Sequence, residues 1–119
     1  MILATTVTAD RNSGFGTDPD NNTTDQIFLL SIAEANEYFN SNDERMCAPT
    51  AYVKAEGADT NDSCKVDGEA TCRWWLRSPG NYQYYAAVVD IDGDVSSLGG
   101  NVDYDYACVR PAFWINLDS

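Results

Sequence analysis

Hydrophobic and polar positions in the first third of the chain predict strands separated by a long loop. Residues 2–8 (ILATTVT) are rich in β-branched side chains, which favour a strand. Residues 10–25 hold Gly, Pro, Asn, Asp and Thr without periodicity, which is the composition of a loop. Residues 27–30 (IFLL) form a short continuous apolar run, so we expect a short buried strand there.

Two helices are predicted next. Ser31 is a good N-cap and Glu34 follows three residues later, a capping-box pair that predicts a helix over residues 31–39. A second helix is expected over residues 49–56, where Pro suits the first turn and Gly57 ends the helix. The second helix lacks a clear apolar stripe. The apolar positions on one face of the first helix are Ile32, Ala35 and Phe39.

The pattern changes to strands after a polar stretch at residues 57–70, which is predicted to be a loop. Residues 73–78 (RWWLRS) are typical of a strand. Residues 84–91 and 94–98 flank an Asp-Gly pair at 92–93, which is the strongest hairpin signal in the chain.

The last predicted strand covers residues 107–117, with Pro111 at an edge or a bulge. Helices in the first half followed by antiparallel strands predict an α+β fold, with the two helices packed on a small antiparallel sheet. Alternation with a period of two predicts which side chains of the strands point inward. Inward positions are Val89, Val95, Val102 and Val109, with Trp75 also buried, and outward positions are Tyr84, Asp94 and Tyr104.

Composition narrows the function classes. The 119 residues suffice for one domain with one core. The net charge of −12 argues against a nucleic-acid partner, because a phosphate backbone needs a basic patch. The absence of His argues against Ser-His-Asp catalysis and His-ligated metals. No apolar run approaches the roughly 20 residues of a membrane span, so membrane insertion is not expected.

The N-terminus shows neither a basic start nor a long apolar stretch, so no signal peptide is recognised. Because the chain begins almost directly in a strand-like run, we expect residues 1–119 to be a single domain from the C-terminal part of a longer protein.

Four cysteines, at positions 47, 64, 72 and 108, show no C-x-x-C spacing and, without His, predict no zinc site. Cys64 and Cys72 enclose an Asp-Gly turn, so a disulfide across a hairpin is one prediction. Reduced and partly buried thiols are the alternative if the protein matures in a cytosol. No metal and no cofactor is expected.

Two charged patterns each have a structural and a functional interpretation. Asp90, Asp92 and Asp94 resemble part of a calcium loop, but the Gly and the bidentate Glu of an EF-hand are not matched. The acidic face of a hairpin is the preferred interpretation. Arg77 and Arg110 adjoin Pro and aromatic residues, and we expect them to bind backbone carbonyls or a carboxylate. A clamp for an anionic substrate is the alternative.

Residues 81–106 have the most unusual composition in the chain. Five Tyr, five Asp, two Asn and two Ser fill 14 of these 26 positions. Tyr offers rigid contact area at low entropic cost, and Ser and Asn offer adaptable hydrogen bonds, as in antibody loops. The window therefore favours recognition of a ligand. The alternative is a Tyr-rich and Asp-rich β-meander without any special history.

The same window fits a history of adenine-directed substitution. One or two adenine changes in an Asn codon give Tyr, Asp, Ser, Ile, Val, Leu, Gly or Cys, but not Lys, Glu, Met or Trp. None of these four occurs between Asn81 and Tyr106; one Gln, which such changes also cannot give, does occur, at Gln83. The residues left over are small apolar and turn residues, which form a framework. The positions that such changes can reach are Tyr82, Tyr84, Tyr85, Val88, Asp90, Ile91, Asp94, Ser96, Ser97, Leu98, Gly100, Asp103, Tyr104, Tyr106 and Cys108.

Several motifs carry a resemblance to a known family. WWLRSPG at 74–80 and VRPAFWINL at 109–117, together with FLLSIAEANEYF and CAPTAYVKAEGA, resemble a domain of unknown function common in gut Firmicutes. Such domains look like the C-type lectin fold in its formylglycine-generating-enzyme-like branch. Some members resemble variable proteins of diversity-generating retroelements, and the resemblance places the variable region at about residues 81–108.

The departures from that pattern limit what the resemblance implies. The sugar-binding triplets EPN, QPD and WND of calcium-dependent lectins are absent, so calcium-mediated sugar binding is not implied. The cysteines and His of formylglycine-generating enzymes are not matched in a recognisable motif, so catalysis is not implied.

We therefore expect a binding domain and not an enzyme, presented at a cell surface or on a phage particle through a parent protein. Its partner would be a protein or glycan with a basic surface. The alternatives are a fixed surface-binding module and a Cys-dependent enzyme that uses Cys47, Cys64 or Cys72. The expected ligand-binding residues are Tyr82, Tyr84, Tyr85, Val88, Asp90, Asp94, Ser96, Ser97, Leu98, Asn101, Asp103, Tyr104 and Tyr106.

Overall fold

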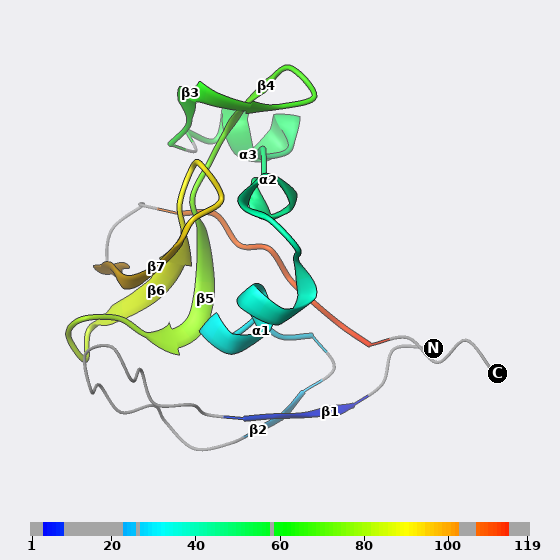
Figure 1. Cartoon of the computed structure of the whole chain (residues 1–119), viewed down its shortest axis with the longest axis vertical. Helices are drawn as coiled ribbons and strands as arrows, with labels where there is room; N and C mark the ends of the chain where they lie inside the picture. Colours follow the sequence, from blue (N-terminus) through cyan, green and yellow to red (C-terminus); the bar gives the residue numbers. More distant parts are fainter. Residues whose placement is uncertain (1–3, 9–22, 26, 58, 103–106, 115–119) are drawn as a thin grey trace, which may run out of the picture.

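The computed structural model describes residues 4–8, 23–25, 27–57, 59–102 and 107–114. In this part of the chain the fold is α+β, with three short helices and seven strands. The strands pair antiparallel in every named sheet. Figure 1 shows the hairpin of β3 and β4 with α3 at one end of the molecule, and the pair of β1 and β2 at the other. The predicted fold class is confirmed.

The central sheet comes from the second half of the chain. Its strands are β5 (Trp74–Pro79), β6 (Tyr85–Val89) and β7 (Val95–Asn101), in the order β5-β6-β7. The predicted Asp-Gly hairpin joins β6 to β7, and the Asp90 N–H donates to the Asp94 carbonyl at 2.8 Å. Gly93 is required in this turn, because its φ is +85° and a Cβ would lie 1.8 Å from the Asn42 carbonyl oxygen.

The core lies on one face of this sheet. Its buried members are Leu30, Ala35, Trp74, Leu76, Ala87 and Val89. Trp74 is fully buried, and its indole N–H donates to the Arg45 carbonyl at 2.9 Å, which satisfies the one polar atom of the side chain. Trp75 is only half-buried. The buried tryptophan is therefore Trp74, and the prediction that it is Trp75 is wrong.

Helix α1 (Ile32–Tyr38) covers the core and contacts β5 and β7. The predicted capping box is confirmed: Ser31 Oγ accepts from the Glu34 N–H, and Glu34 Oε1 accepts from the Ser31 N–H. The Ile32 N–H donates to Ser78 Oγ at 2.9 Å, which fixes the first turn of the helix to β5. The predicted apolar face is confirmed as well, with Ala35 buried and the other two residues packed against the core.

The second predicted helix exists as α3 (Ala51–Ala55), with Thr50 as its N-cap. All five residues are exposed, so α3 does not pack on the sheet as expected. The reason is visible in the sequence, since its apolar residues alternate and form no stripe with a helical period. Another short helix, α2 (Asn42–Arg45), was not predicted. Ser41 is its N-cap, and its Arg45 is buried.

The expected polar loop at residues 57–70 is mostly a hairpin, so that prediction is wrong. Strand β3 (Asn61–Val66) pairs with β4 (Glu69–Thr71). Asp67 and Gly68 have φ of 51° and 82°, the two positive values that a type I′ hairpin turn needs. Most side chains of β3 are exposed. The strand therefore lacks the apolar alternation that would have predicted it.

The N-terminal predictions are confirmed only in part. Strand β1 (Thr5–Val7) lies within the predicted strand, and it pairs with β2 (Thr23–Asp25), where a loop was expected. The rest of the predicted loop, up to residue 22, lies outside the described residues. The buried strand expected at 27–30 is wrong, because Ile27 is exposed and Phe28 forms only a single bridge, to Ala112.

Within residues 107–114, the predicted final strand is replaced by two isolated bridges, Trp74 with Cys108 and Phe28 with Ala112. Without regular strand geometry the expected alternation is lost. Val109 is 67% exposed and Val102, at the end of β7, is 55% exposed, so both inward predictions are wrong. The inward positions of Val89 and Val95 and the outward positions of Tyr84 and Asp94 are confirmed. Tyr104 lies outside the described residues.

Candidate functional site

Three tyrosines, two in the loop between β5 and β6 and one at the start of β6, pack against one another. The rings of Tyr82 and Tyr84 are stacked with centroids 5.4 Å apart, and the Tyr85 ring meets both edge-on at 5.1 Å. Tyr82 is 51% exposed and Tyr84 is 56% exposed, while Tyr85 is half-buried. We call these three residues the tyrosine cluster. It offers two stacked, accessible phenol rings on a third that anchors them to β6.

Backbone hydrogen bonds hold this loop beside the end of β7. The Asn81 N–H donates to the Leu98 carbonyl at 2.8 Å, and the Val102 N–H donates to the Tyr84 carbonyl at 3.2 Å. In the register of the sheet, Asn101 lies opposite Tyr85. Leu98 is exposed, and Ser96, Ser97 and Asn101 are half-buried. The sheet therefore brings the tyrosine cluster together with the predicted residues of the distal part of β7.

The structure separates two predicted aspartates from the tyrosine cluster. Asp90 and Asp94 lie in the turn between β6 and β7, at the far end of β6 from Tyr85. Five residues of extended strand span about 17 Å. Asp94 is exposed, but Asp90 forms an ion pair with Arg73 at 3.0 Å. The aspartates therefore contribute charge near the surface and not direct contacts beside the tyrosine rings.

One predicted ligand-binding residue is ruled out by its burial. Val88 has 0% exposure, because it lies in the middle strand with Trp75 and Ser96 as its neighbours across the sheet. A side chain in that position cannot touch a ligand on the surface. Asp103, Tyr104 and Tyr106, which were also predicted to bind, lie outside the described residues.

The acidic segment is a hairpin turn. Asp92 Oδ1 accepts from the Asp94 N–H at 3.0 Å, and Asp90 Oδ1 accepts from the Ile91 N–H at 2.9 Å. These carboxylates are therefore occupied by local backbone groups. Among the described residues, no group of three His, Cys, Asp or Glu side chains is arranged to hold a metal ion.

Arg77 is a structural residue, as one of the two interpretations predicted. Its Nη1 donates to the Leu29 carbonyl at 2.8 Å, its Nε donates to the Thr8 carbonyl at 3.0 Å, and its guanidinium pairs with Glu34. Burial alone would raise the pKa of Glu34, but hydrogen bonds from Arg77 and Ser31 and the positive charge of Arg77 hold that pKa below its ordinary value.

Arg110 also has structural contacts. Its guanidinium lies 5.1 Å from the centroid of the Phe39 ring and 5.0 Å from that of Trp74, and its Nη1 donates to the Arg45 carbonyl at 3.4 Å. These cation–π contacts place a positive charge at the edge of the core. The charge faces a pocket that the sequence did not predict.

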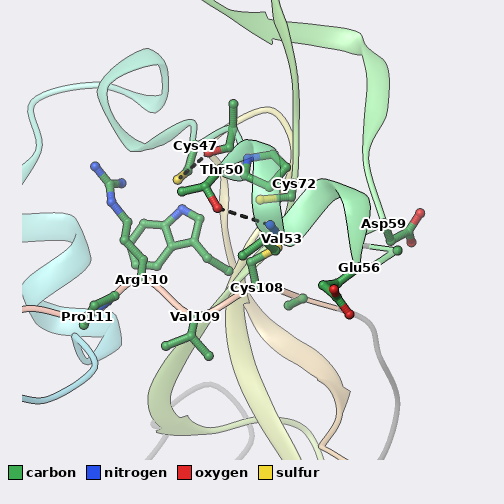
Figure 2. Close-up of a pocket in the computed structure, with 15 residues that line it drawn as sticks. Cys47, Thr50, Val53, Glu56, Asp59, Cys72, Cys108, Val109, Arg110 and Pro111 are labelled. Carbon is green, nitrogen blue, oxygen red and sulfur yellow. Dashed lines mark hydrogen bonds between the residues drawn. The ribbon is translucent and has the colours of Figure 1, made fainter.

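That pocket has a volume of about 510 Å³ and lies between α3, the start of β5 and residues 107–111. Figure 2 shows Cys47, Cys72 and Cys108 on its wall, with Arg110 on one side and Glu56 and Asp59 on the other. The three cysteines come from segments 25 and 36 residues apart (72 − 47 and 108 − 72). No local spacing motif could have brought them together, because each contributes from a different part of the fold.

All four cysteines are free thiols, so the predicted disulfide between Cys64 and Cys72 is wrong and the alternative of free thiols is confirmed. Cys72 is fully buried, while Cys47 and Cys108 are half-buried. A hydrogen bond from the Cys72 thiol lowers the pKa of Cys47 to about 6 against the opposing effect of burial, and Arg110 lowers it further. The same hydrogen bond, burial and a contact with Cys108 raise the pKa of Cys72.

Fold and surface define a small α+β domain with a tyrosine cluster beside β7 and a thiol-lined pocket. The chain belongs to the family described as "Domain of unknown function (DUF6273)", whose family model matches residues 1–117. No curated protein and no solved structure gives a significant match. Of the helices in the described ranges, none has the length and apolar character needed to cross a membrane.

Proposed function

We propose that this chain is a ligand-binding display domain whose specificity is set by the tyrosine cluster and the neighbouring residues of β7. It works by binding and not by catalysis, and a parent protein presents it at a cell surface or on a phage particle. The observation that carries the proposal is the packing of three tyrosines into one accessible cluster, with two rings more than half exposed.

The chemistry of the cluster supports recognition. An exposed tyrosine ring offers a large apolar contact area to a ligand and loses little conformational entropy on binding. Tyr is also enriched among the residues that dominate the binding energy of interfaces. The three rings support one another, so their order is largely fixed before a ligand arrives. Preorganised side chains lower the entropic cost of association.

The charge of the domain indicates which ligands fit. The net charge is −12, and Asp94 is exposed at the turn beyond β6. A negative field accelerates the encounter with positively charged partners. We therefore propose a protein or a glycan with a basic surface as the ligand class.

We further propose a C-type lectin-like fold in which residues 81–108 are the variable region of a diversity-generating retroelement. The α+β class and the position of the tyrosine cluster inside that window support this proposal. Coding DNA tests it: we expect adenine-rich codons at the substituted positions, a near-copy of the window close by, and a neighbouring reverse transcriptase gene. A single invariant copy without a reverse transcriptase would favour a fixed binding module instead.

The binding claim is tested with tyrosine variants. Ligands are first selected from defined panels of basic proteins and glycans, and affinity is then measured by titration calorimetry. We expect Tyr82→Ala and Tyr84→Ala each to weaken binding tenfold or more, which corresponds to about 1.4 kcal/mol. Tyr52→Ala is the matched control, because Tyr52 is an exposed tyrosine on α3, away from the cluster. Equal losses from Tyr52→Ala, or binding that depends on Cys47, would overturn the proposal.

A further inference from the structure

The cysteine pocket has no part in the proposed binding surface. The tyrosine cluster follows the C-terminal end of β5, whereas Trp74, at the start of β5, lines the pocket. A strand of six residues spans about 20 Å. The pocket volume of about 510 Å³ lies within the usual range for small-molecule sites, roughly 300–1,000 Å³. The pocket is therefore a site separate from the tyrosine cluster.

Cys47 and Cys72 are direct partners in an isolated antiparallel bridge. The Cys72 N–H donates to the Cys47 carbonyl at 2.8 Å. Residues paired in this way have Cα atoms roughly 5.5 Å apart, which falls inside the range of roughly 4.4–6.8 Å found for disulfides. The Cys47 thiol donates to the Ala48 carbonyl at 3.6 Å, and the neighbouring Cys72 thiol lowers the pKa of Cys47. The backbone therefore already holds this pair at a spacing that a disulfide can bridge.

The two thiols differ in exposure. Cys47 is half-buried on the pocket wall. Cys72 also lines the pocket but is fully buried, with 0% of its surface exposed. The guanidinium of Arg110 is fixed over two aromatic rings on the same side of the pocket, and its charge favours the thiolate of Cys47. A thiolate is the reactive form of cysteine. Cys47 is thus the accessible nucleophile, and Cys72 is placed to attack a sulfur bound to it.

We propose that Cys47 and Cys72 form a thiol–disulfide exchange site for low-molecular-weight disulfides. The Cys47 thiolate attacks one sulfur of the disulfide, forms a mixed disulfide and releases the other half as a thiolate. Cys72 then loses its proton to solvent and attacks the Cys47 sulfur, which forms the internal disulfide and releases the second half. The two protein thiols lose two electrons together, and the small disulfide gains them as two thiols.

Cys108 has a supporting role in this site. Its backbone is hydrogen-bonded on both sides of Trp74, to the Arg73 carbonyl at 2.8 Å and to the Trp75 N–H at 3.0 Å. Its thiol contacts Cys72. Cys72 therefore sits between two half-buried thiols, of which Cys47 is the one whose thiolate the charge of Arg110 favours.

Ellman's reagent, an aromatic disulfide, tests the proposal on the reduced full chain by stopped-flow absorbance. We expect a fast phase that releases two equivalents of thiolate per chain, with a rate that rises with pH around a midpoint of about 6. Cys47→Ser should abolish the fast phase. Cys72→Ala should release one equivalent and leave a stable mixed disulfide on Cys47. Cys64→Ser is the matched control, because Cys64 lies on β3 outside the pocket, and it should leave the fast phase unchanged.

Peptide mapping of the oxidised wild-type chain gives a second measurement that does not depend on the folding of any variant. We expect a peptide pair linked through Cys47 and Cys72, which dithiothreitol separates again. A link between Cys72 and Cys108, or a fast phase that persists in Cys47→Ser, would overturn the assignment. The fast phase is measured without any binding partner, so its failure and the failure of the proposed binding function are distinguishable.

Discussion

At the scale of single residues, the tandem tryptophans show what an alternating pattern can and cannot define. Neighbouring residues of a strand point to opposite faces, so one of Trp74 and Trp75 must face the core. Shifting the register by one residue exchanges them, and the sequence RWWLRS is apolar at both positions. The fold decides in favour of Trp74, whose indole N–H donates to the backbone carbonyl of Arg45, the last residue of α2.

Trp74→Ala should therefore be the most damaging single truncation in the core. Trp74 is fully buried and contacts Phe39 edge-on at 6.3 Å, so we expect a loss of about 3–5 kcal/mol in the free energy of unfolding. Urea titration monitored by circular dichroism measures it. Trp75→Ala is the control and should cost clearly less, because Trp75 is half-buried. A larger loss from Trp75→Ala would contradict the register of β5.

At the scale of elements, local chemistry predicts those that contain their own signal. The capping box defined α1, and the Asp-Gly pair defined the hairpin of β6 and β7. Of the hairpin of β3 and β4 only the Asp-Gly turn was predicted, because the exposed polar side chains of β3 show no alternation that would indicate a strand. Helix α2 is only four residues long and offers no periodicity to detect.

The ion pair of Glu34 with Arg77 joins α1 to β5 and should make stability depend on pH. The folded pKa of Glu34 lies below its ordinary value of 4.5, because hydrogen bonds and charge outweigh burial. Its contribution is therefore fully present above that ordinary value and is lost as the pH falls through the folded pKa. Melting temperatures measured between neutral and acid pH should fall further for the wild type than for Glu34→Gln.

Glu34→Gln isolates the charge, because Gln at the same position still completes the capping box. At neutral pH we expect it to cost about 1–3 kcal/mol, the usual worth of a hydrogen bond to a charged group. Glu37→Gln is the matched control, since Glu37 is an exposed glutamate on the same helix. If both variants show the same pH profile as the wild type, the ion pair does not contribute to stability.

At the scale of the whole molecule, the sequence predicted the tyrosine-rich window but not the pocket. The tyrosine window was visible in composition, and the structure gathers Tyr82, Tyr84 and Tyr85 into one cluster. The same window also contains a fully buried residue, Val88, which lies in the middle strand between Trp75 and Ser96. The cysteine pocket depends on contacts between distant segments, which no window of sequence contains.

Residues 81–108 should thus divide into positions that tolerate substitution and positions that do not, and one comparison tests this division. Gly99 has a φ of +72°, and a Cβ there would lie 1.9 Å from the Ala86 carbonyl oxygen. For Gly99→Ala we expect about 1–3 kcal/mol from backbone strain and about 1–3 kcal/mol more from the overlap. The double variant Tyr82→Ser with Tyr84→Ser removes larger side chains, but from the surface, and should cost only about 1–2 kcal/mol. Thermal melts of both variants measure the two losses of stability. If the tyrosine variant is the less stable, the cluster is part of the scaffold, and its exposed rings would have to be explained by stability and not by recognition.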